Sequence, residues 1–575
     1  MVKSLINKRY SYKNSKDFLF IIFAIFFLFA LCTTFSFKIS SIDGGYYQLQ
    51  ANAFLKGKIR LLIEPSTQLL ALPNPYDPIQ NGSYRLHDAL LFHNHYYLYW
   101  GPVPAIVRIL FFNQFPEQFF IFFYVTGCVI LYYFIINKIK ASYFPKINTI
   151  FFCFALISGC FNGAILNLLA SSGIYYEAIA AAQFFFLSGF LFTTHYLSNK
   201  RGSYLFLSAI FYILSIFSRI SYLFPCFFIG LYYLIGQFKS LIRKRQLRKL
   251  SSLTTVFLLF SPYLIGIFLI CLYNFLRFGN FLEFGLQYQL AGIDMSLNYP
   301  KFTSIHNIPN NIQNYFFNLP TLISHLPFVS MNTKHYPNIE RLVFSAFLIS
   351  PITIFSLFLS KSSTNVTKIK YFLFLVFFLF VISVSLFSPT SATRYYFDFI
   401  FIFSLLGFVS LGIFRKNRIV LFSLFPLSVI FTFFALTMFL KAIQESHHQA
   451  YFNINKFIYS LTQNSNTIDK TAYADLTLVA NKTNYLIINN AISRNATISL
   501  YPQTIQTYTI LGQTGISLTF VSFESQSVSV NLSYQSHIKP KSIITSQPLV
   551  IHPGINKIDI QASVVPIELS NFELL

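Results

Sequence analysis

Long hydrophobic runs separated by short polar breaks fill the chain from residue 18 to about residue 441. A helix that crosses the hydrocarbon core of a bilayer needs roughly 20 mostly apolar residues, and on that rule we expect about eleven transmembrane helices. The first run is too long for a signal-peptide core and lacks a small-x-small cleavage site, so we interpret it as a retained span. The expected spans are 18–37, 118–136, 147–161, 178–196, 204–218, 222–238, 253–273, 342–360, 371–388, 398–414 and 419–441.

The pattern changes after about residue 450, where Ser, Thr, Asn and Gln dominate and short β-branched stretches alternate with turn residues. Such spacing is typical of an all-β domain and predicts a β-sandwich of about eight strands. The expected strands are "DLTLVA", "NYLIINN", "ATISLY", "QTYTIL", "ISLTFVSF", "SVSVNLSY", "PLVIHP" and "KIDIQASV".

The first long polar break contains one helical pattern. Apolar residues recur at helical spacing over 46–54, polar residues occupy another face, and Gly57 provides a natural stop. We expect a short amphipathic helix that lies in the membrane interface.

Lys and Arg gather in alternate breaks between the hydrophobic runs. Short cytoplasmic loops retain Lys and Arg, so all of these breaks belong on the cytoplasmic side. The alternation places the long breaks 38–117 and 274–341, and the whole tail, outside the cytoplasm. We therefore predict a cytoplasmic N-terminus over 1–17, an all-α polytopic membrane domain over 18–445 and an extracytoplasmic β-sandwich domain over 446–575.

Composition supports a membrane protein and excludes other classes. Of the residues, 54% are hydrophobic and only 10% are charged, whereas soluble domains carry about 25% charged residues. The net charge of +24 does not indicate a nucleic-acid partner, because the basic residues are spread over the loops. None of the six cysteines lies in the tail, which excludes an internal disulfide or a CxxC metal site there.

Charged residues at the outer ends of the spans are the candidates for chemistry, because charges near a bilayer are costly to keep. No nucleotide sugar or ATP is expected outside the cytoplasm, and the chain has no glycine-rich phosphate loop. A polyprenyl-phosphate-linked sugar is an activated donor that the membrane itself delivers. Its transfer needs one carboxylate to take the acceptor's proton and cations to hold the phosphate. The outer-face cations are Arg219, Arg277 and Arg394.

Several stretches carry a resemblance to a known family. Together with the acid-bearing first outer loop, its interfacial helix and the many spans, they resemble uncharacterised bacterial membrane proteins grouped with the GT-C superfamily. That superfamily comprises integral-membrane glycosyltransferases that use lipid-phosphate sugars, such as the protein O-mannosyltransferases and the lipid A aminoarabinose transferase. The resemblance covers roughly 18–441. The stretches are "FHNHYYLYWGPVPAIV" (92–107), "IYYEAIA" (174–180), "YNFLRFGNFLEFGLQYQL" (273–290) and "SATRYYFDF" (391–399).

The resemblance implies that Asp43, in the first outer loop, is the catalytic base. Arg394, with Arg277 or Arg219, would hold the polyprenyl phosphate. Many GT-C enzymes have Asp-Glu where this chain has Asp43 followed by two glycines, so no divalent metal is indicated, and no other cofactor is expected. The further substrate-binding candidates are Tyr46, Asp88, His95, Trp100, Glu177 and Glu283.

Each candidate also has a structural interpretation. Asp43 is suited to cap the helix that begins near Tyr46, and Glu177 to begin the fourth span, where a helix N-terminus favours an acid. The arginines are equally suited to anchor the protein at lipid headgroups. The stretch "YYLYWGPVP" is suited to form an aromatic belt at the membrane interface as well as a wall of the sugar site. The histidines over 87–95 lack the spacing of a metal site, which favours a solvated or substrate-facing loop.

The sequence thus predicts an inverting, polyprenyl-phosphate-sugar-dependent glycosyltransferase of a bacterial inner membrane. Its acceptor would be an extracytoplasmic glycan, lipid or protein. Two alternatives stay open, namely an oligosaccharide polymerase or ligase, and a non-enzymatic lipid-glycan transporter or scaffold. A transporter is expected to place polar residues at mid-span on discontinuous helices, whereas the charged residues here lie mostly at one face.

Overall fold

The fold comes from a computed structural model of the 575-residue chain. The chain divides into two units, 1–320 with 331–439 and 321–330 with 440–575, and each is described by itself. The described residues are 2–39, 45–82, 84–111, 115–171, 174–199, 201–243, 250–331, 339–340, 342–358, 364–414, 417–462, 484–487, 498–500, 516–522, 526–535, 540–551, 554–560 and 568–574.

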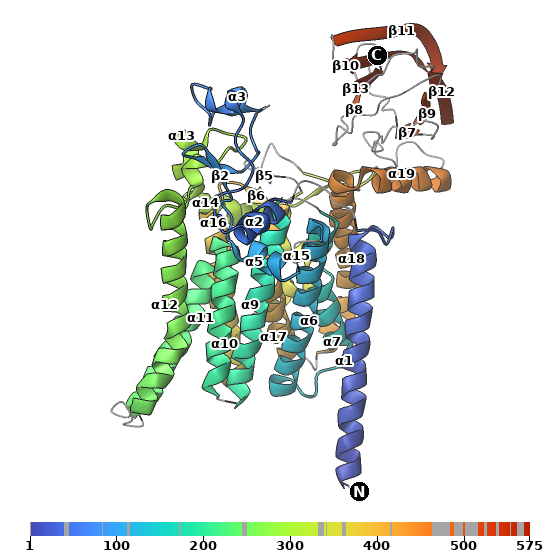
Figure 1. Ribbon diagram of the computed structural model, residues 1–575. Coiled ribbons are helices and arrows are strands. Elements are labelled where there is room, and N and C mark those ends of the chain that lie inside the picture. The colour runs from blue at the N-terminus through green and yellow to red at the C-terminus, as the bar shows by residue number, and fades with distance from the viewer. Residues whose placement is uncertain are drawn as a thin grey trace. The chain divides into compact units, whose positions relative to one another are not determined.

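The first unit is a bundle of long helices that run roughly side by side (Figure 1). Eight helical segments of the described chain are long and apolar enough to cross a membrane, and two shorter apolar helices, Asp17–Cys32 and Gly202–Ser218, accompany them. This is the architecture of a multi-pass membrane protein. The helices are α1 (Val2–Cys32), α6 (Glu117–Tyr143), α7 (Thr149–Cys160), α8 (Gly163–Ala170), α9 (Ile174–Asn199), α10 (Gly202–Ser218), α11 (Leu223–Arg243), α12 (Leu250–Phe278), α16 (Thr364–Leu386), α17 (Tyr396–Ile413) and α18 (Arg418–Ser446), whose last turns belong to the second unit.

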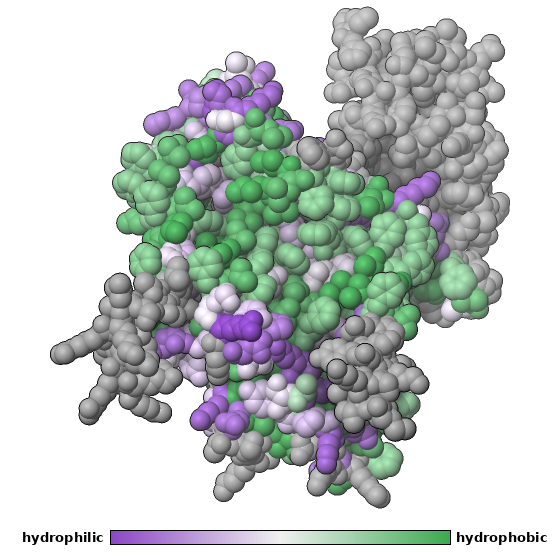
Figure 2. Space-filling view, turned by 60° about the horizontal axis from the view of Figure 1, so that its bottom comes forward, coloured by the Kyte–Doolittle hydropathy of each residue, from purple (hydrophilic) through white to green (hydrophobic). Residues whose placement is uncertain are grey.

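Hydrophobic side chains cover the outside of the bundle as well as its core. In Figure 2, hydrophobic residues spread over the middle of the visible face, and hydrophilic residues gather toward its two ends. On α18, Ile419, Phe422 and Phe425 are each more than three-quarters exposed. Exposed apolar surface of this extent is stable only in contact with lipid, whereas α17 is almost completely buried among its neighbours.

Ten of the eleven predicted spans coincide with these helical segments, but the one predicted at 342–360 does not form a continuous helix. It contains the short α15 (Ala346–Ile349) and the 3₁₀ helix η4 (Pro351–Leu357). The break falls at Ser350, whose φ is −140° and ψ is 87°. Pro351 explains it, because proline has no N–H and disfavours the helical conformation in the residue before it.

The interrupted segment nevertheless follows α17 along its whole length. At one end Thr393 donates to the carbonyl of Leu342, and at the other end the rings of Phe358 and Phe414 are 5.8 Å apart. Non-helical backbone at membrane depth is tolerated only where protein surrounds it. Much of the segment from 342 to 357 is fully buried, which meets that condition.

One end of the bundle carries a layer of loops and short elements, and this is the end predicted to face outward (Figure 1). The strands β1 and β2 form an antiparallel hairpin, and Leu90 bridges to Gln289, which joins the first long loop to the second. The predicted interfacial helix is present as α2, and it ends just before Gly57, whose φ of +66° suits glycine. The elements are α2 (Tyr46–Leu55), α3 (Thr67–Leu70), α4 (Pro78–Asn81), β1 (Leu90–Phe92), β2 (His95–Tyr97), α5 (Val103–Leu110), η2 (Leu286–Tyr288), α13 (Met295–Phe302), α14 (Asn307–Ile312), the π-helix η3 (Gln313–Phe317), β5 (Ile339–Glu340), β6 (Ser391–Ala392) and η5 (Thr393–Tyr395).

The second unit contains helix α19 (His448–Thr462), the small hairpin of β3 (Thr321–Leu322) and β4 (Val329–Ser330), and the tail strands. The described tail strands pair in the orders β11-β10-β13-β8 and β12-β9-β7. The predicted strands at 475–480 and 506–511 lie outside the described residues, and face-to-face packing of the sheets as a sandwich stays a prediction. The strands are β7 (Asn484–Ile487), β8 (Ile498–Leu500), β9 (Ile516–Ser522), β10 (Gln526–Gln535), β11 (Pro540–Ile551), β12 (Gly554–Ile560) and β13 (Glu568–Leu574).

Candidate functional site

The predicted base, Asp43, lies outside the described residues. The helix after it begins at Tyr46, and the residue at its N-cap position is Gly45, which supplies no side-chain cap. The first turn of α2 packs into a cluster of polar and aromatic side chains at the loop-bearing end of the bundle. Tyr46 donates its hydroxyl hydrogen to the carbonyl oxygen of His87, and its ring meets that of Trp100 edge-on.

Asp88 is the carboxylate at the centre of this cluster. Its side chain is 4% exposed. One carboxylate oxygen, Oδ2, accepts a short hydrogen bond from the hydroxyl of Tyr175, and the other, Oδ1, accepts one of 3.0 Å from Gln289 Nε2. Nε2 of His87 lies 3.5 Å from Oδ2. Three different segments of the chain therefore meet at one buried acid.

The backbone holds Asp88 in an uncommon conformation. Its φ is +60°, in the left-handed region, which Asp tolerates better than most residues. Its N–H donates to the carbonyl of Leu290 at 3.0 Å, and Tyr46 holds the carbonyl of His87 from the other side. Strain of this kind persists only where the surroundings impose it.

Arg394 contacts Tyr175, the tyrosine that also binds Asp88. Its guanidinium carbon lies 4.5 Å from the ring centre of Tyr175 and 4.9 Å from that of Tyr395, and its side chain is buried. A guanidinium over an aromatic face gains a cation–π attraction. Tyr175 thus contacts a cation with its ring and an anion with its hydroxyl.

Hydrogen bonds from the second long loop fix the backbone that precedes Arg394. Asn314 Nδ2 donates to Ser391 Oγ at 3.0 Å, and the N–H of Ala392 donates to the hydroxyl of Tyr315 at 2.9 Å. Both partners lie in the π-helix η3. Pi-helical turns frequently mark functional sites, and here the turn positions the strand that leads into Arg394.

Arg219 also contacts Tyr395, with its guanidinium carbon 4.8 Å from the ring centre. Its Nε donates to Asp398 Oδ2 at 3.1 Å, and the Asp398 side chain is fully buried. A buried carboxylate needs such a partner. The positive charge of Arg219 is therefore balanced by Asp398.

Aromatic rings complete the cluster. Trp100 contacts Tyr99, Tyr175 and Tyr46, with ring centres 4.3, 5.4 and 6.0 Å apart. Burial, with the charge of Asp88, raises the pKa of Tyr99 far above the usual range of a phenol, although nearby arginines oppose the shift. Its hydroxyl is therefore protonated at neutral pH.

The remaining predicted residues lie apart from this cluster. Arg277 donates to the carbonyl of Leu98 at 2.9 Å and is packed between Tyr273 and Phe278. Glu283 accepts hydrogen bonds from its own loop, from the N–H of Gly285 and from Gln287.

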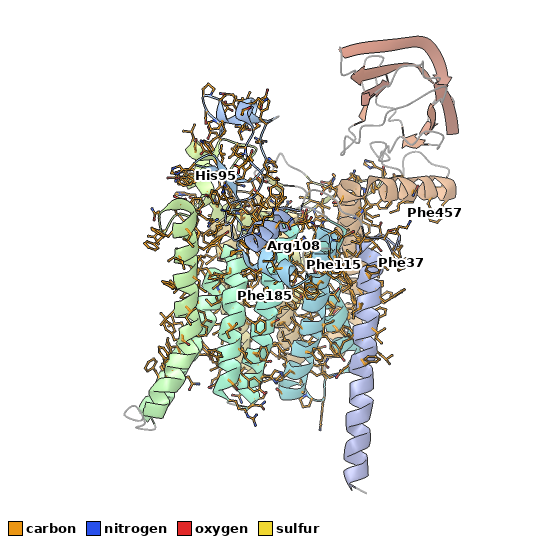
Figure 3. All side chains as sticks on the ribbon, in the orientation of Figure 1. Phe37, His95, Arg108, Phe115, Phe185 and Phe457 are labelled. Carbon is orange, nitrogen blue, oxygen red and sulfur yellow. The ribbon has the colours of Figure 1, made fainter. Side chains whose placement is uncertain are left out.

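His95 also lies outside the cluster. It contacts Arg60 and Glu64 on the partly exposed hairpin. Figure 3 places His95 in the loop layer, farther from the helices than Arg108.

Glu177 forms a buried ion pair that the sequence analysis did not anticipate. Arg108 Nε lies 2.9 Å from Oε1 and Nη2 lies 2.6 Å from Oε2, and both side chains are 0% exposed. Glu177 lies in the first turn of α9, as its structural interpretation requires. Burial by itself lowers the pKa of Arg108, but the charge of Glu177 and the hydrogen bond to it outweigh that effect and raise the pKa.

Tyr175, Tyr99, Gln289 and Arg108 are the site residues that the sequence analysis missed. Tyr175 lies in the stretch "IYYEAIA", close to the predicted Glu177, and Tyr99 lies in "YYLYWGPVP", next to the predicted Trp100. Arg108 follows an amphipathic pattern in α5, and only the fold brings it to Glu177. Within the described residues, no group of three or more His, Cys, Asp or Glu side chains is placed to hold a metal ion.

No protein-family model matches the chain, and no curated protein sequence matches it significantly. The geometry of the cluster therefore has to carry the functional argument. It joins a buried carboxylate, guanidinium groups and aromatic faces at one end of a membrane bundle. Guanidinium groups are suited to bind a phosphate, and aromatic faces are suited to pack against a sugar ring.

Proposed function

We propose that the chain is a membrane glycosyltransferase that moves a sugar, with inversion, from a polyprenyl-phosphate donor to an extracytoplasmic glycan, lipid or protein. The observation that carries the proposal is the shared contact on Tyr175, whose hydroxyl binds Asp88 while Arg394 lies over its ring. Sugar transfer from a phosphate leaving group needs a base that takes the acceptor's proton and a cation that stabilises the departing phosphate. The membrane bundle supplies access to a lipid donor.

In this mechanism the cations hold the phosphate as its negative charge grows. Arg394 is the principal candidate, because its guanidinium lies over the ring of Tyr175, whose hydroxyl binds Asp88. Arg277, which lies apart from the cluster, is the second candidate cation. Within the described part of the chain it forms no ion pair with a carboxylate, and its buried Nε has no hydrogen-bond partner.

The predicted base stands close in the sequence to a residue of the cluster. Asp43 precedes Tyr46 by three residues in the sequence, and Tyr46 contacts both the His87 carbonyl and the Trp100 ring. The GT-C resemblance implies that Asp43 is the base. The protein would lie in a bacterial inner membrane with this cluster outside, and the tail would form an extracytoplasmic β-sandwich.

The proposal is tested with the purified full-length protein in lipid nanodiscs. A panel of radiolabelled polyprenyl-phosphate hexoses and pentoses is supplied with water or envelope extract as acceptor, and release of polyprenyl phosphate is measured. We expect turnover of at least one donor and a strongly raised donor KM in Arg394→Ala. A wild-type protein that binds and turns over no donor of the panel would contradict the proposal.

One observation favours the transporter as a second candidate. The segment 342–358 is a discontinuous span, and Ser350 within it hydrogen-bonds Ser158 and Ser404. Polar groups at mid-span on a broken helix are typical of transporters. These hydroxyls, however, hydrogen-bond one another and the backbone groups that the break leaves unpaired. The same contacts therefore also stabilise the broken helix. Transbilayer movement of a fluorescent polyprenyl-phosphate lipid in proteoliposomes, without loss of its sugar, would favour the transporter.

A further inference from the structure

His87 and Asp88 form a pair whose geometry goes beyond phosphate binding. The two side chains point to different environments, since Asp88 is 4% exposed and His87 is 55% exposed. The buried carboxylate faces one ring nitrogen of His87, Nε2, at 3.5 Å. With Nε2 next to the carboxylate, the other ring nitrogen, Nδ1, is the one left to take a proton. This is the division of roles in an acid–histidine pair, in which a buried carboxylate orients an accessible imidazole.

The surroundings hold the pair in place from both sides. Tyr175 and Gln289 fix the two oxygens of Asp88. Tyr46 fixes the carbonyl of His87, and the left-handed backbone of Asp88 turns the two side chains relative to one another. A strained residue held by four partners is an observation from which a functional hypothesis follows.

We propose that His87, oriented by Asp88, is the general base that takes the proton of the acceptor. The proposal rests on the glycosyltransferase function above and assigns to this pair the role that the family resemblance gives to Asp43. In the reaction the acceptor oxygen forms a bond to the anomeric carbon, and the bond from that carbon to the phosphate oxygen breaks. The acceptor proton passes to His87 Nδ1, and the phosphate leaves with the bonding electrons.

Asp88 stabilises the imidazolium that this transfer creates, and it does not itself take the proton. In the proposal Arg394, whose guanidinium carbon lies 4.5 Å from the ring centre of Tyr175, stabilises the charge that gathers on the departing phosphate. The His87–Asp88 pair thus acts on the attacking acceptor oxygen, and the guanidinium acts on the leaving phosphate. General-base catalysis of this kind contributes about 10²- to 10⁴-fold to the rate.

The test uses the full-length protein in nanodiscs with a donor that the wild type turns over. His87→Ala is expected to lose about 10²- to 10⁴-fold in kcat with an unchanged donor KM. Added imidazole is expected to restore part of the rate, because it replaces the missing ring. His93→Gln is the matched control, since His93 is an exposed histidine of the same loop, and its rate is expected to stay within about twofold of the wild type.

A second variant keeps the test informative if one protein folds poorly. Asp88→Asn preserves the shape of the side chain and tolerates the left-handed backbone, and we expect it to lower kcat without raising the donor KM. If His87→Ala keeps the wild-type rate while Asp43→Asn loses it, the pair is not the base, although the proposed function stands. Loss of rate in His87→Ala without imidazole rescue, and with an unchanged pH–rate profile, would also overturn the pair. Absence of wild-type turnover would overturn both proposals.

Discussion

At the scale of single residues, Tyr175 is the side chain that links the acid to the cation. Replacement by Phe keeps the ring under Arg394 and removes the hydroxyl that binds Asp88. A hydrogen bond to a charged group contributes about 1.5–3 kcal/mol. We therefore expect Tyr175→Phe to lower kcat about 10- to 100-fold while the donor KM stays within about twofold.

The comparison variant for this measurement is Arg394→Ala, in which the cation is lost and the donor KM is expected to rise. Steady-state kinetics of the two variants on one donor separate the role of the cation from that of the tyrosine hydroxyl. A Tyr175→Phe protein with a raised KM and an unchanged kcat would show that the hydroxyl serves donor binding instead.

The buried ion pair of Arg108 and Glu177 is expected to stabilise the fold. Removal of one partner leaves a charge in a site from which water is excluded, which costs about 3–5 kcal/mol. Glu177→Ala is thus expected to lower the midpoint of thermal unfolding of the purified protein markedly. Glu64→Ala removes one partner of the exposed pair with Arg60, whose side chains are 59% and 34% exposed, and should cost less than about 1 kcal/mol. Equal shifts in the two variants would contradict a stabilising role for the buried pair.

At the scale of elements, the contact between α17 and the interrupted segment depends on Gly407. A Cβ at this position would lie 2.3 Å from the carbonyl oxygen of Ile352, whereas a Cβ at Gly236 in α11 meets nothing within 4 Å. Gly407→Ala is expected to push η4 away and to destabilise the protein by about 1–3 kcal/mol. Gly236→Ala gains helix propensity and is expected to be neutral or stabilising by up to about 1 kcal/mol.

Thermal unfolding in detergent measures both glycine variants under one condition. The test is whether Gly407→Ala unfolds at a lower temperature than Gly236→Ala, because the substitution is chemically identical in both positions. A Gly407→Ala protein as stable as Gly236→Ala would mean that η4 does not pack on α17 in the way described.

The elements also show which parts of the fold the sequence determines locally. Ten spans could be predicted because lipid demands a fixed length of apolar residues. The span at 342–360 has that length too, but Pro351 removes a backbone donor, and the resulting break is stabilised by Ser158 and Ser404, which are distant in the sequence. Hydrophobic length alone does not reveal such long-range compensation.

The candidate site divides in the same way. Asp88, Arg219 and Arg394 could be chosen from the sequence because only 10% of the residues are charged, and Trp100 and Tyr46 because they stand in the first outer loop. Their assembly could not be predicted, since it depends on the loop register that brings Asp88 next to Gln289 and Tyr175. That register follows from tertiary packing across some two hundred residues of chain, not from local pattern.

At the scale of the whole molecule, the donor argument depends on the side of the membrane that the cluster faces. The alternation of basic loops places Ile79 and the tail outside and Arg201 inside. In a cysteine-free background, single cysteines at Ile79, Ser527 and Arg201 report this directly with a membrane-impermeant maleimide. Ile79 is 92% exposed, so its labelling is not limited by burial.

We expect Ile79→Cys and Ser527→Cys to react in intact spheroplasts and Arg201→Cys to react only after the membrane is permeabilised. Each variant is also labelled in detergent, which confirms that its thiol is reactive. The reverse pattern would place the cluster in the cytoplasm, where nucleotide sugars are present. The reason for a lipid-linked donor would then be lost, because a soluble activated sugar would reach the same side chains without the membrane.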